Sequence, residues 1–75
     1  MGVFDEYLRQ YGYTRYMLAK KAGINESGLQ KAAKAEKLEN ISTRVMLLTS
    51  ENLNIPIGEV ITDLYNLFKN KEWMT

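Results

Sequence analysis

The side chains of this chain that could bind a ligand are mainly basic and polar, and they gather in its middle. Residues 15–44 contain seven lysines and arginines against three acidic residues, a net charge of +4. The rest of the chain contains three basic and six acidic residues, a net charge of −3. A cluster of Lys and Arg attracts phosphate, so the pattern indicates a nucleic-acid surface. A solvated helix surface would carry the same charges, and charge alone does not decide between the two.

The sequence offers little for catalysis or metal binding. It has no histidine and no cysteine, which removes the commonest general base, the commonest nitrogen ligand of metals and any thiolate site. Asp5 and Glu6 are adjacent on a predicted helix and point in different directions, so they do not make a catalytic pair. We therefore expect no enzyme activity, no metal and no cofactor, and no small-molecule ligand is evident.

Length and composition predict one small domain. The chain has 75 residues, of which 45% are hydrophobic and 25% charged, as in ordinary globular proteins. No apolar run approaches the roughly 20 residues of a membrane-spanning helix. The N-terminus is acidic within six residues, unlike a signal peptide. We expect a cytoplasmic protein with no membrane partner.

Hydrophobic spacing predicts a first helix over residues 3–11, ending at Gly12, where a positive φ is easily adopted. Thr14 is a good N-cap for a second helix, which Gly23 ends. The inward face of the second helix is predicted to consist of Met17, Leu18, Ala19 and Ala22.

A third helix is predicted to follow the cap Asn25, with Leu29, Ala32 and Ala33 on its inner side. Ser27 with Gln30 also matches a capping box, which would start this helix two residues later. The start at Asn25 is preferred because it leaves the shorter turn.

Residues 36–41 are predicted to form a loop, and Ser42 to cap a fourth helix. That helix is predicted to turn inward Val45, Leu48, Leu53, Met46 and Leu47. The "NIP" at 54–56 stops it, and a fifth helix over residues 57–68 follows. Its apolar stripe is predicted to be Val60, Ile61, Leu64, Tyr65 and Phe68.

The residues assigned most firmly to the core are Leu8, Leu18, Leu48, Leu53, Ile61 and Leu64. Nothing alternates with period two, so the fold class is all-α with five helices.

The break at Gly23 divides "TRYMLAKKAGINESGLQKAA", residues 14–33, which is otherwise rich in helix formers. Two short helices at a sharp angle need a small residue where they cross, and Ala19 meets that need. The turn needs a residue that adopts positive φ, here Gly23, and the second helix needs an apolar residue facing back, here Leu29. This spacing is typical of a helix-turn-helix, whose second helix can enter the DNA major groove.

The same stretch resembles the helix-turn-helix of the phage Cro and lambda-repressor-like transcriptional regulators. The residues that carry the match are Thr14, Leu18, Ala19, Gly23, Ile24 and Leu29. The later "ISTRVMLLTSENLNIPIGEVI" resembles the fourth and fifth helices of that family, and together the match covers about residues 3–68. It implies a five-helix DNA-binding domain over residues 1–68, followed by a tail over residues 69–75. Arg15 stands where the family often has Gln, and Gly28 where it often has Ser or Thr.

The resemblance places the outward residues of the third helix nearest the bases, and these are Glu26, Ser27, Gln30 and Lys31. Glu26 could accept a hydrogen bond from cytosine N4, Gln30 could reach adenine, and Lys31 could reach guanine or a phosphate. Glu26 could instead serve only the helix dipole. Gly28 either allows the backbone to approach DNA closely or is a tolerated surface glycine.

Candidate phosphate contacts flank this helix. They are Thr14 and Arg15 at the second helix, Ser42, Thr43 and Arg44 at the fourth, and Lys34, Lys37 and Asn40 between them. Helix N-termini and arginine forks both suit phosphate, and such contacts position a protein without reading sequence. The alternative for each is an ordinary cap or a solvated charge.

Leu67 lies off the main stripe of the fifth helix, and the tail adds Trp73 and Met74, which is more apolar surface than so small a domain can readily bury. This surplus predicts a homodimer contact at the end of the chain, formed by Leu67, Phe68 and Trp73. Trp73 could instead fold back onto the monomer.

The function expected first is sequence-specific binding of double-stranded DNA, most simply as a small repressor that occupies an operator. The second expectation is a protein-interaction module, antitoxin-like or adaptor, on the same fold.

Overall fold

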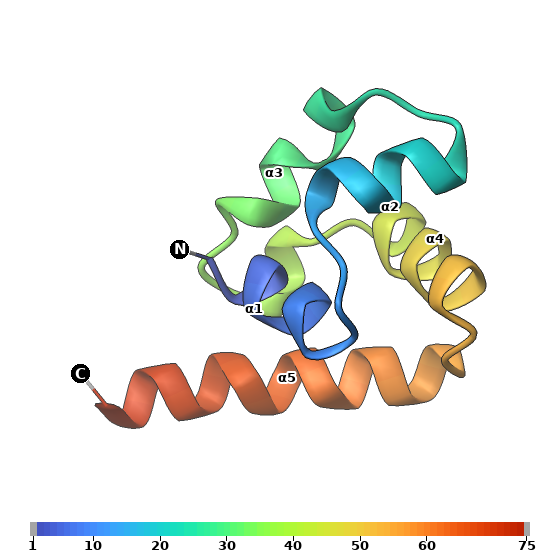
Figure 1. Ribbon diagram of the computed structural model, residues 1–75. Helices are drawn as coiled ribbons and strands as arrows, with labels where there is room; N and C mark the ends of the chain where they lie inside the picture. Colours follow the sequence, from blue (N-terminus) through green and yellow to red (C-terminus); the bar gives the residue numbers. More distant parts are fainter. Residues whose placement is uncertain (1, 75) are drawn as a thin grey trace.

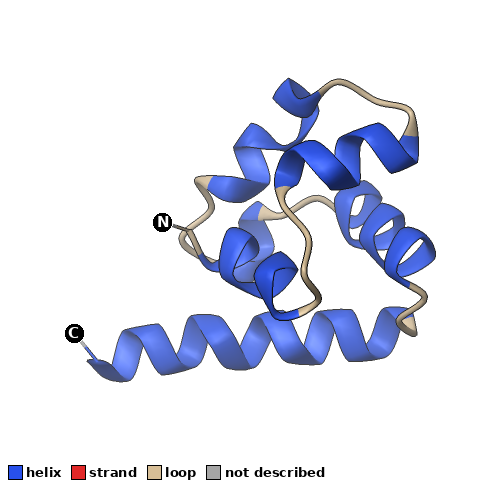
Figure 2. Cartoon of the chain, in the orientation of Figure 1, coloured by secondary structure: helices blue, strands red, loops and turns tan. Residues whose placement is uncertain are grey.

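The computed structural model describes residues 2–74 of the chain, with side chains for residues 2–71. These residues form helices and no strands (Figure 1, Figure 2), as the sequence predicts. The elements in chain order are α1 (Val3–Gln10), α2 (Arg15–Ala22), the 3₁₀ helix η1 (Glu26–Leu29), α3 (Gln30–Ala33), the 3₁₀ helix η2 (Leu38–Asn40), α4 (Thr43–Leu53) and α5 (Ile57–Met74). The radius of gyration is 11.4 Å, close to the roughly 11 Å expected of a compact domain of this length. None of the described helices is both long and apolar enough to cross a membrane.

The core forms where α1 and α4 both pack against the long helix α5, with α2 and α3 on the side of α1 away from α5 (Figure 1). Four side chains of α1 are at most 1% exposed, namely Val3, Phe4, Tyr7 and Leu8. They meet Val60 and Leu64 of α5, which are 0% exposed. Removing this apolar surface from water is the main force that holds the short helices together.

The apolar stripe of α5 differs from the prediction. Val60, Leu64 and Phe68 are buried as expected, but Ile61 is 40% and Tyr65 47% exposed, so neither belongs to the core. Successive helical residues are about 100° apart, and α1 and α4 pack against the side of α5 that carries Val60 and Leu64. Leu67, which lies off the predicted stripe, packs partly against the core instead. The helix also continues to Met74 and includes most of the predicted tail.

Two inward residues of α2 and α4 are also corrected. Met17 and Leu47 are each 44% exposed, while their neighbours Leu18 and Met46 are buried. Each of these helices buries a narrow stripe, so an apolar residue beside the stripe faces solvent. Thr49 of α4 is fully buried, which the sequence did not indicate, and its hydroxyl donates a hydrogen bond to the Val45 carbonyl at 2.8 Å.

The predicted caps of α2 and α4 are confirmed. The Thr14 hydroxyl accepts a hydrogen bond from the Met17 amide at 3.1 Å, and the Ser42 hydroxyl accepts one from the Val45 amide at 3.2 Å. Gly12 has the expected positive φ, 75°. Both caps satisfy an amide that the first turn of a helix leaves without a partner.

The third helix begins after Asn25, as preferred, but its first turn is the 3₁₀ helix η1 rather than α. The Asn25 side chain makes no capping hydrogen bond. The backbone carbonyl of Asn25 instead accepts a hydrogen bond from the Gly28 amide at 3.0 Å. The predicted loop over residues 36–41 contains η2 and ends on Ile41, which is 3% exposed and anchors it.

Candidate nucleic-acid interface

The segment joining α2 to η1 turns sharply at Gly23, where φ is 74°. The Ile24 amide donates to the Ala19 carbonyl at 3.0 Å, and the Gly23 amide to the Lys20 carbonyl at 3.3 Å. This pair of bonds closes the end of a helix and needs the left-handed backbone that glycine adopts without strain. The predicted break is therefore confirmed, and α2 does not run on into the next helix.

The η1–α3 segment has one buried and one exposed face. Leu29 is 0% and Ala32 2% exposed. Opposite them, the four residues predicted to approach DNA bases are all exposed, namely Glu26, Ser27, Gln30 and Lys31. Their side chains are therefore available to a ligand lying along this segment.

One side of this exposed face adjoins the N-terminus of α4. Two neighbouring surface hollows share Gly28 and Ser42 in their walls. The candidate residues that they bring together are Ser27, Lys31, Lys34, Asn40, Ser42 and Arg44. Three of these are cations and one acid, Glu39, also lies there, so a phosphate would meet net positive charge.

The other side of the face adjoins the N-terminus of α2. A smaller hollow of about 220 Å³ lies there, lined by Asp5, Arg9, Tyr13, Thr14, Arg15, Tyr16 and Glu26. Glu26 thus shares a wall with two candidate phosphate contacts, Thr14 and Arg15. The exposed η1–α3 face therefore lies between the beginnings of two helices.

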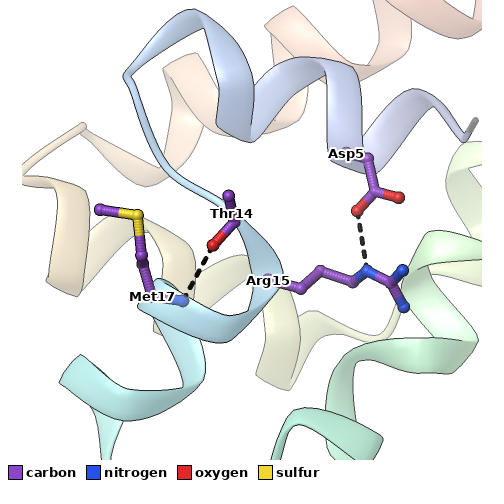
Figure 3. A network of polar contacts seen from close by, with 4 residues as sticks. All are labelled: Asp5, Thr14, Arg15 and Met17. Carbon is purple, nitrogen blue, oxygen red and sulfur yellow. Dashed lines mark hydrogen bonds and ion pairs between the residues drawn. The ribbon is translucent and has the colours of Figure 1, made fainter.

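Arg15 is held by a residue that the sequence analysis missed. Its Nε lies 3.0 Å from Oδ1 of Asp5 in α1 (Figure 3), with the side chains 32% and 18% exposed. From the sequence, Asp5 is only one of two adjacent acids on the first predicted helix. The ion pair depends on the angle between α1 and α2, which no local pattern of residues specifies.

Three of the candidate DNA contacts do not line the hollows on either side of the η1–α3 face. Lys37 and Thr43 border a separate groove with Tyr65 and Lys69, between η2, α4 and α5. Gln30 is exposed but lines none of the hollows described above. Lys37 and Thr43 thus line a different hollow from the cluster around Ser42, although Glu39 borders both.

Two of the three predicted dimer residues pack against the core of the monomer. Phe68 is 6% exposed within the core, Leu67 packs partly against it, and the side chain of Trp73 lies outside the described residues. Among the described side chains of α4 and α5, the large apolar ones that are exposed are instead Leu47, Ile61 and Tyr65.

Burial raises the pKa of Tyr7 well above its usual range, and hydrogen bonding with Tyr11 and Asp63 adds to the effect. Tyr7 therefore stays protonated as a donor within the core, away from the candidate face. Among the described residues no three acidic side chains gather closely enough to hold a metal ion.

Comparisons with protein-family models, with curated proteins and with solved structures each found no match to this chain.

Proposed function

We propose that this chain binds double-stranded DNA in a sequence-specific way and regulates transcription, as its resemblance to the Cro and lambda-repressor-like regulators implies. In this proposal α2 and the η1–α3 segment are a helix-turn-helix, and η1–α3 enters the major groove. The observation that carries it is the exposed η1–α3 face, which lies between the capped beginnings of α2 and α4.

The flanks of the face and the face itself take different roles. Lys31, Lys34 and Arg44 on one side, and Arg15 on the other, neutralise phosphates and fix the position of the domain on the duplex. Ser27 and Gln30 then read base edges by hydrogen bonds, and Glu26 accepts from a cytosine amino group. The simplest way for so small a DNA-binding domain to regulate is as a repressor, by occupying an operator and excluding polymerase.

Selection of bound sequences from a random DNA pool with the purified protein tests this proposal directly. We expect an enriched site, and an inverted repeat with half-sites about one helical turn apart if two copies bind together. Four phosphate contacts per domain, one for each of these cations, would weaken binding roughly 150-fold between 50 and 200 mM salt. An unenriched pool together with salt-independent retention would contradict the proposal.

A second candidate function, a protein-interaction module, is favoured by a different observation. Leu47, Ile61 and Tyr65 are exposed apolar side chains on α4 and α5, and none of them lines the hollows beside the η1–α3 face. Substituting all three by serine should abolish partner binding and leave DNA binding by a single domain intact. Loss of DNA enrichment and retention of a protein partner would favour this candidate.

A further inference from the structure

The guanidinium of Arg15 is fixed at one end before any ligand arrives. Asp5 pairs with Nε, 3.0 Å away, and Nε carries only one of the five N–H donors of the group. Figure 3 shows the two terminal nitrogens beyond Nε at the end of the side chain, with one of them directed away from Asp5. The side of the guanidinium that suits a phosphate is therefore the side that the ion pair leaves open.

The two helices that carry this ion pair, α1 and α2, are anchored in the core by buried side chains. Phe4 precedes Asp5 in α1 and is 0% exposed, and Leu18, one turn after Arg15 in α2, is also 0% exposed. The pair lies in the hollow that Thr14 and Glu26 also line. Arg15 is thus held beside the first residue of η1, where the proposed DNA face begins.

We infer that Asp5 is a positioning residue for DNA binding: it anchors Arg15 through Nε and aims the two terminal nitrogens at a backbone phosphate. The inference rests on the proposed function. Long, flexible side chains lose rotamer freedom when they bind, and one that is already ordered loses less. A partly exposed ion pair such as this one adds little to folding stability, so its effect should appear in binding.

The direction in which one substitution changes DNA affinity separates this role from a purely electrostatic effect. A carboxylate near DNA repels phosphate, so removing Asp5 should tighten binding if its charge were all that mattered. If Asp5 positions Arg15, Asp5→Ala should weaken binding to the selected site about 2- to 10-fold, although the protein becomes more positive.

Glu6→Ala is the matched control, because Glu6 is the exposed acidic neighbour in the same first turn of α1. It should leave binding unchanged or tighten it. In an Arg15→Ala background Asp5→Ala should no longer weaken binding, since the two residues act as one unit. Thermal unfolding of each variant verifies the fold, and Asp5→Asn replaces Asp5→Ala if the latter unfolds.

The outcomes distinguish the two proposals. Weaker binding by Asp5→Ala alone, lost in the Arg15→Ala background, supports the positioning role. Equal or tighter binding by Asp5→Ala, in a wild-type protein that binds DNA, overturns the positioning role and leaves the proposed function standing. A wild-type protein that binds no DNA at any salt concentration overturns both.

Discussion

The hydroxyl of Tyr7 in α1 donates a hydrogen bond to Oδ2 of Asp63 in α5 at 3.0 Å, and so joins helices whose residues are 56 positions apart. The ring of Tyr7 is 0% exposed and meets the ring of Tyr11 edge-on, with centroids 5.4 Å apart. The contact between the first and last helices therefore combines apolar burial with a satisfied polar group.

Tyr7→Phe should destabilise the fold by about 1–2 kcal/mol, because it leaves the half-buried Asp63 carboxylate without this donor. The pKa of Tyr7 is raised in the folded protein, so the folded state holds this proton more tightly than the unfolded state. The stabilisation is complete below about pH 10, the usual tyrosine value, and falls above it by up to about 1.4 kcal/mol per pH unit. Urea unfolding at pH 7 and pH 11 should show a smaller alkaline loss in Tyr7→Phe than in wild type. Identical losses in the two proteins would contradict this account.

Gly28→Ala tests the glycine of η1. An added Cβ would meet only Cδ1 of Ile24, at an ordinary 3.7 Å. Because alanine restricts the unfolded chain more than glycine does, we expect the substitution to stabilise the fold by about 0.4–1 kcal/mol and to leave DNA affinity unchanged. Weaker DNA binding by this more stable variant would mean that the backbone of η1 touches the duplex. Gly58→Ala in α5 has open space around the new Cβ and is the control for stability without a place on the DNA face.

How far the sequence predicted this molecule depends on how local each feature is. The caps Thr14 and Ser42 and the turn at Gly23 follow from the residues within one helical turn, and all three are confirmed. The burial of Leu29 and the exposure of Ser27 follow from helical period alone.

Features set by packing between distant helices were missed. Ile61 and Val60 are apolar neighbours, and the positions of α1 and α4 against α5 decide that Val60 is the one buried. The Asp5–Arg15 and Tyr7–Asp63 contacts depend in the same way on angles between helices. For the candidate site, the sequence therefore indicated the exposed face but neither the acid that holds Arg15 nor the separation of Lys37 from the other cations.

Arg15 and Gln30 should affect DNA binding differently. Arg15 lies beside the beginning of η1 and is assigned to phosphate, so Arg15→Ala should weaken binding about equally on all sequences. Gln30 is exposed on α3 and is assigned to a base edge, so Gln30→Ala should relax the preference at one position, with a cost of about 1–3 kcal/mol on the best site. Selection from a random pool with each variant measures both effects. Identical shifts of the two selected profiles would show that these roles are wrongly assigned.

Lys34 and Lys37 form a matched pair, three residues apart and both exposed, on either side of the short loop that begins after α3. Lys34 lines the hollow with Lys31 and Ser42, whereas Lys37 lines the groove with Tyr65. Both were expected to touch phosphate, but this geometry favours only Lys34. Lys34→Ala should therefore weaken binding and reduce the slope of log affinity against log salt by about one, while Lys37→Ala should change neither. Titrations of one labelled site at several salt concentrations give both quantities. An equal loss of slope in the two variants would place the duplex along the loop and across both hollows, and would move the proposed interface toward α5.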